Sequence, residues 1–209
     1  MASLKEIIAA LAKYPVATVY EALGKVGDMS NRIRPVGPGM RVAGPALTVK
    51  TFPGDMQPVF HAITRAEPGD VLVVDAGDAE RGTIWGGTGT AAAQARGVTG
   101  LVTNGATRDL DEVIELKFPV FAAGVSLRGT VRGQHMGWIG TTIAIGDVPV
   151  SPGDIILGDC DGVLVIPRAR AEEALHLAEA QHERETTRDE RLRNGEDVVK
   201  VLNLPAWPN

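Results

Sequence analysis

Cysteine is nearly absent from this chain, since Cys160 is the single one among 209 residues. One cysteine excludes a disulfide within the chain, and a chain of this length can bury a core without such a cross-link. The four histidines form neither an HExxH motif nor a Cys/His pair at zinc spacing, which argues against the common zinc sites. These absences favour one domain that folds in a reducing compartment, and we expect a cytoplasmic protein.

Basic charge and long apolar runs are also scarce. Asp and Glu outnumber Lys and Arg by 26 to 21, which gives a net charge of −5, and aromatic residues make up 4% of the chain. No basic stripe with interleaved aromatics occurs, so nucleic acid is not expected as a direct ligand. No run reaches the ~18 apolar residues that span a bilayer, and no signal-peptide core is evident, so we expect no membrane association. A small charged metabolite remains open as the ligand.

What is present is an alternation of helical and extended patterns through residue 122. Ser3 as an N-cap and Glu6 three residues later predict a capping box and a helix to about residue 13. We expect further helices at residues 17–23, 56–65, 88–96 and 109–116, strands at 46–52, 71–74, 98–103 and 118–122, and a Pro/Gly-rich loop at 31–44. This alternation is typical of α/β proteins.

Beyond residue 122 the chain turns mostly to short strands. Four are expected, at residues 143–145, 148–150, 155–157 and 163–166, separated by Gly-Asp, Pro-Gly-Asp and Asp-Gly turns. They favour a mixed sheet, or two packed sheets, over a pure doubly wound fold. A long, charge-rich helix is expected at residues 168–193, with apolar spacing that suits packing against a neighbour as much as its own core. We predict one domain over residues 1–195 and an extended tail over 196–209.

The stretch from Gly86 to Asp109 carries the strongest indication of function. Gly86-Gly87-Thr88-Gly89 opens a predicted helix, whose unpaired amides and partial positive charge suit an anion. After the strand at residues 98–103, Arg108 can hold the same anion from the side. Asp109 adds a hard oxygen ligand, which suits a divalent cation beside the anion. The sequence therefore predicts an anion and metal site at one edge of a sheet.

These residues also have a purely structural interpretation. The glycines could form a tight turn, and Asp109 with Glu112 has the form of a capping box, which would leave Arg108 solvated. The position of the pair after a buried strand, where open α/β sheets bind ligands, favours a functional role. The loose GxGxxA pattern from Gly87 suggests a dinucleotide site. We discount it because the preceding expected strand ends near Asp75, whereas a Rossmann turn follows its strand directly.

Other candidate residues receive ordinary structural assignments. His135 is expected to be exposed or hydrogen-bonded and not an acid/base, and Cys160 to be a small core residue. Trp85 is expected to pack in the core and not to stack on a ligand. Glu183 and Glu185 are expected on a solvated helix face, from which they could reach the site of a neighbouring subunit.

Several motifs together resemble a known family. They are Trp85-Gly86-Gly87, the twenty residues between Gly87 and Arg108, the Arg108-Asp109 pair, Phe118-Pro119-Val120-Phe121, and Pro152-Gly153-Asp154 leading into Gly158-Asp159-Cys160-Asp161-Gly162-Val163. This pattern resembles the 4-hydroxy-4-methyl-2-oxoglutarate aldolases, a family that also contains the regulator of ribonuclease activity A. The resemblance runs from about residue 15 to about residue 195. It implies an α/β/β domain similar to the swivelling phosphohistidine domain, with mixed sheets, assembled as homotrimers or homohexamers with sites between subunits.

The resemblance also implies an activity, that of a class II (metal-dependent) pyruvate aldolase and oxaloacetate decarboxylase. It makes Arg108 the substrate arginine, Asp109 the ligand of Mg²⁺ or Mn²⁺, and the loop formed by Gly86, Gly87, Thr88 and Gly89 the cradle of a pyruvate-type carboxylate. The metal would stabilise the pyruvate enolate that remains when a 4-hydroxy-2-keto acid is cleaved or oxaloacetate loses carbon dioxide. Glu183 or Glu185 would correspond to an acidic residue that the family supplies from an adjacent protomer.

Two positions depart from the family pattern. Met56 stands where relatives often have Asn, and Thr88 where Leu or Asn is common, which leaves the distal substrate group undefined. The alternative that the resemblance offers is a member without catalysis that regulates a ribonuclease by binding it. Such members can lack the metal carboxylate, so Asp109 favours catalysis.

Overall fold

A mixed sheet organises the chain in the computed structural model, which describes residues 2–77, 82–130 and 137–208. Within these residues the main sheet has nine strands in the order β1-β6-β5-β3-β2-β10-β11, with β4 beside β5 and β7 beside β2. The strands are β1 Arg34–Pro35, β2 Val42–Lys50, β3 Val71–Asp75, β4 Thr83–Trp85, β5 Gly100–Thr107, β6 Val120–Val125, β7 Trp138–Ile139, β10 Ile155–Asp159 and β11 Gly162–Ile166. A separate hairpin pairs β8 Ile143–Ile145 with β9 Val148–Val150.

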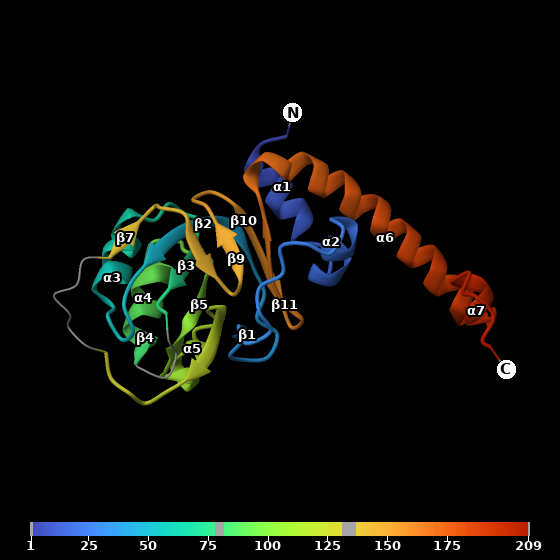
Figure 1. Ribbon diagram of the computed structural model, residues 1–209. Helices are drawn as coiled ribbons and strands as arrows, with labels where there is room; N and C mark the ends of the chain where they lie inside the picture. The colour runs from blue at the N-terminus through green and yellow to red at the C-terminus, as the bar shows by residue number, and fades with distance from the viewer. Residues whose placement is uncertain (1, 78–81, 131–136, 209) are drawn as a thin grey trace.

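The centre of the sheet is parallel and its two ends are antiparallel. Strands β2, β3, β5 and β6 run parallel, as does the short β4 beside β5, whereas β1, β7, β10 and β11 pair antiparallel with their neighbours. The sheet curls until its ends almost meet (Figure 1), and Arg34 Nη1 on β1 donates to the Asp161 carbonyl at the turn before β11, 2.7 Å away. The predicted mixed sheet is therefore confirmed as a nearly closed one.

The helices cover the sheet in two groups. Helices α3 Gln57–Arg65, α4 Gly87–Ala95 and α5 Leu110–Glu115 lie near the parallel strands, whereas α1 Leu4–Leu11, α2 Val16–Ala22 and the first turns of α6 Ala171–Arg193 lie over β10 and β11 (Figure 1). The long C-terminal helix is confirmed. Its buried residues lie between 171 and 178, His182 and Glu185 still contact Tyr14 and Thr18, and only the C-terminal part extends away from the body of the molecule (Figure 1). No helix in the described ranges combines the length and apolar composition needed to cross a bilayer.

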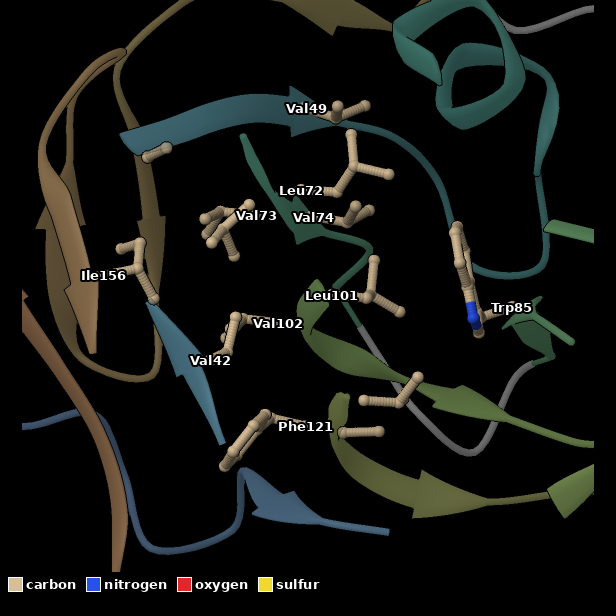
Figure 2. Close-up of a cluster of buried hydrophobic side chains, with 14 of the residues drawn as sticks. Val42, Val49, Leu72, Val73, Val74, Trp85, Leu101, Val102, Phe121 and Ile156 are labelled. Carbon is tan, nitrogen blue, oxygen red and sulfur yellow. The ribbon is translucent and has the colours of Figure 1, made fainter. Parts of the chain in front are cut away.

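The main core lies inside the curled sheet, where β3 is buried at every residue. Figure 2 shows side chains from β2, β3, β4, β5, β6 and β10 converging there; those labelled are Val42, Val49, Leu72, Val73, Val74, Trp85, Leu101, Val102, Phe121 and Ile156. Trp85 is fully buried, stacks on Phe118 with ring centroids 5.7 Å apart, and donates from Nε1 to Thr90 Oγ1 at 2.9 Å. The prediction that Trp85 packs in the core is confirmed. Because β4 and the start of α4 are joined to this core through Trp85, the glycine turn between them has a rigid base.

Local sequence chemistry accounts for the first helix. Ser3 Oγ accepts from the Glu6 amide at 3.3 Å, and the Glu6 carboxylate accepts from the Ser3 amide at 2.7 Å, which is the predicted capping box. Hydrogen bonds from the Ser3 backbone and hydroxyl hold the pKa of Glu6 below its ordinary value.

Two predicted boundaries are wrong because close packing, not turn chemistry, explains the glycines concerned, and one strand was missed. The expected loop at residues 31–44 contains β1 and the start of β2, where a methyl group on Gly44 would overlap the Gly69 carbonyl. Strand β5 continues through Gly105 to Thr107, since a methyl group at 105 would lie 2.9 Å from Ile84 Cγ1. Strand β4 escaped prediction because three residues are too few to show a period.

Two further expectations need correction. Cys160 is exposed, not a core residue, because it occupies the turn between β10 and β11. The tail predicted to be extended contains a short helix, α7 Val198–Val201, which is capped by the Asp197 side chain accepting from the Lys200 amide at 3.1 Å.

Asp159 ties the β10–β11 turn to α2 and supplies a test of the fold. Its buried carboxylate accepts from the amides of Val16 at 2.9 Å and Asp161 at 3.0 Å. We expect Asp159→Ala to lower the free energy of unfolding by roughly 2–3 kcal/mol, because two amides lose a charged acceptor. The exposed Asp161 is the matched control, and Asp161→Ala should change stability by less than about 0.5 kcal/mol. Equal urea midpoints for the two variants would contradict this role.

Candidate active site

A cavity of about 590 Å³ opens where β4 and β5 end. It lies between α3 on one side and the N-terminus of α4 with the Arg108-Asp109 pair on the other. Its lining residues are Met56, Gln57, Phe60, His61, Trp85, Gly86, Thr88, Gly89, Arg108, Asp109 and Thr130. The structure thus brings five of the six predicted site residues to the wall of one cavity, and Gly87 lies between two of them in the chain.

The glycine turn begins α4 as predicted. Gly86 is the N-cap residue in an extended conformation and offers no side chain to the helix. Its carbonyl accepts the first helical hydrogen bond, from the Thr90 amide at 3.0 Å. The amides of Thr88 and Gly89 precede that bond and have no acceptor in the described chain, so they are available to an anion in the cavity.

Asp109 is turned toward α4 by an unusual backbone conformation. It follows β5 with φ 57° and ψ 42°, in the left-handed region that Asp and Asn tolerate better than most residues. Although it stands at the N-cap position of α5, its side chain makes no capping hydrogen bond there. Its Oδ2 instead accepts from the Gly87 amide at 3.2 Å. The interpretation of Asp109 as a helix cap is therefore wrong.

Arg108 lies beside this carboxylate. Its Nε is 3.6 Å from Asp109 Oδ2, and both side chains are about two-fifths exposed, at 39% and 43%. The guanidinium also faces Gly129, where a methyl group would lie 3.9 Å from Nη1. Arg108 therefore has one carboxylate neighbour and a solvent-facing side from which it can pair with an anionic ligand.

Glu112 is a site residue that the sequence did not reveal. One turn into α5, its carboxylate lies so close to the start of α4 that a methyl group on Gly87 would overlap it, while a methyl group on Gly86 would lie 2.5 Å from Asp109 Oδ2. Two acidic side chains thus cover the two glycines. The signal was present in Arg108-Asp109 followed by Glu112, but capping chemistry explained the same spacing.

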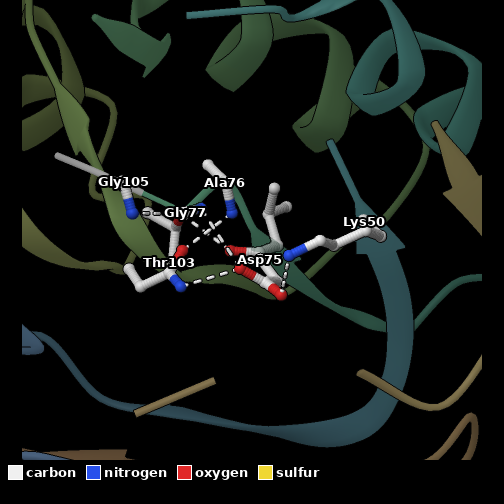
Figure 3. Close-up of polar contacts among 8 residues, drawn as sticks. Lys50, Asp75, Ala76, Gly77, Thr103 and Gly105 are labelled. Carbon is white, nitrogen blue, oxygen red and sulfur yellow. Dashed lines mark hydrogen bonds and ion pairs between the residues drawn. The ribbon is translucent and has the colours of Figure 1, made fainter. Parts of the chain in front are cut away.

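A second polar cluster stabilises the ends of the neighbouring strands (Figure 3). The Asp75 carboxylate, at the end of β3, pairs with Lys50 Nζ at the end of β2 and accepts from Asn104 Nδ2 at 2.8 Å and the Gly77 amide at 3.1 Å. Asn104 Oδ1 in turn accepts from the Ala76 amide at 2.7 Å. Because Asp75 is buried with its acceptors used, this cluster holds the strand ends in place and does not line the cavity.

The wall formed by α3 is also absent from the sequence prediction. Gln57, Phe60 and His61 lie on the exposed face of α3 and line the cavity, while Val59 and Ile63 anchor the opposite face in the core. In the sequence, a Gln, a Phe and a His at this spacing are typical of the exposed face of any amphipathic helix. No local sequence pattern therefore identified them as ligand contacts.

Some predicted residues do not meet at this site. Glu185 accepts from Thr18 Oγ1 at 2.7 Å and from Gln181 Nε2 at 2.8 Å, and Glu183, two residues earlier in α6 and therefore on a different face of the helix, is exposed. Figure 1 places α6 at the other end of the molecule from α4, so neither glutamate lines the cavity of its own chain. His135 lies outside the described residues.

The dinucleotide interpretation needs a correction. Strand β4 ends at Trp85, directly before the glycine turn, so the reason for discounting the GxGxxA pattern was wrong. A different feature opposes it, because the Gly87 amide, the first of the turn that a pyrophosphate would use, already donates to Asp109 Oδ2.

Two acidic groups can be compared as metal sites. Asp159, Cys160 and Asp161 have ligand atoms within 4.8 Å of one another, but both Asp159 oxygens already accept backbone amides. Asp109 Oδ1 and the Glu112 carboxylate, in contrast, have no hydrogen-bond donor in the described chain. Hard oxygen atoms of this kind suit a divalent cation such as Mg²⁺ or Mn²⁺.

Comparison with known proteins supports both the fold and the motifs. The RraA-like family model, described as Aldolase/RraA, matches residues 16–165. A protein of Halalkalibacterium halodurans, provisionally named 4-hydroxy-4-methyl-2-oxoglutarate aldolase, is 34% identical over 188 residues, which cover 90% of this chain and 89% of the relative.

Two solved structures share the arrangement. RraAS2 of Streptomyces coelicolor, described as an unusual member of the RNase ES inhibitor RraA protein family, matches with a TM-score of 0.79 and 26% identity over 89% of this chain and 98% of that one. An uncharacterized protein of Pseudomonas syringae matches with a TM-score of 0.86 and 24% identity over 98% of this chain and 95% of that one, a likeness of fold alone.

Proposed function

Since the chain belongs to the RraA-like family, as its motifs predicted, we propose that it is a divalent-metal-dependent lyase that releases pyruvate. The substrates would be 4-hydroxy-2-keto acids of the 4-hydroxy-4-methyl-2-oxoglutarate type, together with oxaloacetate. The observation that carries this proposal is the pair of carboxylates, Asp109 and Glu112, held against the N-terminal glycines of α4 beside Arg108.

Each part of the cavity has a role in this chemistry. The amides of Thr88 and Gly89, on the α4 turn that begins with Gly86 and Gly87, would bind the carboxylate of the keto acid, and Arg108 would pair with it from the side. These groups would fix the keto acid with its C3–C4 bond in the open part of the cavity. Asp109 and Glu112 would hold Mg²⁺ or Mn²⁺ through oxygen atoms that no donor in the described chain uses. When bound, such a cation supplies Lewis-acid stabilisation of the negative charge left on the keto acid.

The left-handed backbone at Asp109 supports this division of roles. Its Oδ2 accepts from the Gly87 amide, so the carboxylate is oriented before any ligand arrives, and Oδ1 is left for another partner. A side chain held this way loses little conformational freedom on binding, which favours a pre-organised ligand.

The same proposal includes an assembly. We infer a homotrimer or homohexamer with sites between subunits, in which α6, extending from the body of the molecule, reaches a neighbour (Figure 1). Of the two candidate glutamates, Glu183 is the better placed to complete a neighbour's site, because Glu185 is held by Thr18 within its own chain. We also propose that each protomer has a fold similar to the swivelling phosphohistidine domain.

Removal of the metal tests the proposal. We expect the protein with Mg²⁺ or Mn²⁺ to release pyruvate from 4-hydroxy-4-methyl-2-oxoglutarate and from oxaloacetate, and the rate to fall by roughly 10²-fold or more after treatment with EDTA, because a Lewis acid contributes several kcal/mol to such steps. Pyruvate formation is followed with lactate dehydrogenase and NADH, and re-addition of metal is the control for damage. Undiminished release in EDTA would refute metal dependence.

Absence of pyruvate release from both substrates would refute the lyase. The alternative would then be a protein that binds a ribonuclease, since the Streptomyces relative belongs to a family of RNase ES inhibitors. Association with a ribonuclease of the E type, measured by light scattering and by inhibition of RNA cleavage, would test it.

A further inference from the structure

The face of α3 that lines the cavity is built to contact a ligand. Gln57, Phe60 and His61 stand at i, i+3 and i+4, so they project from one side of the helix. The opposite side of α3 is buried, with Val59 and Ala62 fully inside the core. A wall fixed in this way keeps its side chains at a constant distance from the α4 turn.

The two sides of the cavity differ in chemistry. The side formed by the α4 turn carries the Arg108 guanidinium, the Asp109 carboxylate and free amides, with Glu112 close behind at Gly87, and these groups suit a charged keto acid and a cation. The α3 side carries an aromatic ring, a carboxamide and an imidazole, and Phe60 keeps 37% of its surface exposed within this concave site. An exposed aromatic ring beside polar donors is typical of a surface that recognises a mixed apolar and polar group.

We propose that Gln57, Phe60 and His61 form the subsite for the substituents on C4 of the substrate, and so determine specificity; this proposal rests on the proposed lyase function. With the pyruvyl part held at α4 and Arg108, C4 and its substituents extend toward α3. An apolar group on C4 packs against the Phe60 ring. A C4 carboxylate accepts from Gln57 Nε2 and from an imidazole N–H of His61.

This subsite acts on the fragment that leaves. In the cleavage, the C4 hydroxyl loses its proton and becomes a carbonyl, the C3–C4 bond breaks, and its electron pair remains on C3, which later takes up a proton. No oxidant or reductant is required. The substituents on C4 do not react, so contacts with α3 select the substrate and orient the bond that breaks, and they have no counterpart in oxaloacetate, whose chain ends at C4.

Binding of two stable ligands separates this subsite from the catalytic groups. 2-Oxoglutarate carries a distal carboxylate but no C4 hydroxyl to cleave, and pyruvate lacks the distal part. We expect His61→Ala to weaken 2-oxoglutarate binding by roughly tenfold in calorimetry with Mg²⁺ present, and to change pyruvate binding by less than about twofold. His61→Gln, which keeps a donor, should restore most of the affinity. Equal losses for both ligands would overturn the proposal.

Substrate discrimination tests the aromatic contact. We expect Phe60→Ala to lower kcat/KM for 4-hydroxy-4-methyl-2-oxoglutarate by about fourfold relative to 4-hydroxy-2-oxoglutarate, which lacks the C4 methyl group. Oxaloacetate decarboxylation should stay within about twofold of wild type. Arg65→Ala, on α3 but outside the cavity lining, is the control and should affect no substrate.

The outcomes distinguish the two proposals. A wild-type protein that releases no pyruvate from any of the three substrates overturns the lyase function and this subsite with it. A wild-type protein that is active, with variants at 57, 60 and 61 that lower all three activities equally or none of them, overturns the subsite and leaves the lyase function standing.

Discussion

Asp109→Asn is expected to lower kcat/KM for pyruvate release by roughly 10²- to 10³-fold while leaving the fold intact. Asparagine has the same size as aspartate and tolerates the left-handed backbone found at this position, φ 57°. Its side-chain oxygen can still accept from the Gly87 amide, as Asp109 Oδ2 does at 3.2 Å. The substitution therefore removes the charge that would bind the cation and little else.

The control for this variant stands two residues away. Asp111 is exposed at the start of α5 and does not line the cavity, so Asp111→Asn should keep activity within about twofold of wild type. Thermal unfolding should give similar midpoints for both variants, and metal binding measured by calorimetry should be weakened in Asp109→Asn alone. Full activity of Asp109→Asn would remove the principal support for the lyase.

Asp109→Ala is a less informative change, because it combines two effects. Alanine in the left-handed region costs about 1 kcal/mol, and the Gly87 amide loses its acceptor. A loss of activity in that variant could reflect a displaced α4 turn. Comparison of the two variants separates the charge of Asp109 from its contact with α4.

The parts of the fold that the sequence predicted are those set by local patterns. Ser3 and Glu6 form their capping box because both partners lie within one helical turn. Strand β3, Val71–Asp75, was predicted at residues 71–74 because these four form an apolar run after a Pro-Gly-Asp turn. The meeting of Gly86 with Asp109 was also predicted, from the order of a glycine turn, a helix and a buried strand. Its structural cause, the parallel pairing of β4 with β5, was not predicted, because β4 was missed.

What the sequence could not provide depends on contacts between distant segments. Gly44 lies in a Pro/Gly-rich segment that is typical of a loop, yet it belongs to β2. Glycine is required there because the Gly69 carbonyl leaves no room for a side chain. The direction of the Asp109 side chain depends on a backbone angle that no residue pattern specifies. Glu112 met the requirements of a helix cap in the sequence, and only the packing of α5 against α4 places its carboxylate over Gly87.

Gly87→Ala is the second change for which we expect a large effect, about a hundredfold loss of kcat/KM for pyruvate release. The added methyl group would overlap the Glu112 carboxylate. That carboxylate ends a flexible and exposed side chain, so it can move away at small cost to the fold, but it then leaves its position at the start of α4. Alanine favours a helix more than glycine does, so stability should stay constant or rise by up to about 1 kcal/mol.

Lower kcat/KM together with unchanged or higher stability in Gly87→Ala would show that the loss comes from the site and not from unfolding. Gly129→Ala is the matched control, because a methyl group there would lie 3.9 Å from Arg108 Nη1 with no closer neighbour, and its activity should remain within about twofold of wild type. In a Glu112→Ala background the overlap no longer exists, so adding Gly87→Ala should then cost less than about threefold. If the two losses instead multiplied, Gly87 and Glu112 would act independently, and the loss in Gly87→Ala could not be explained by displacement of the Glu112 carboxylate.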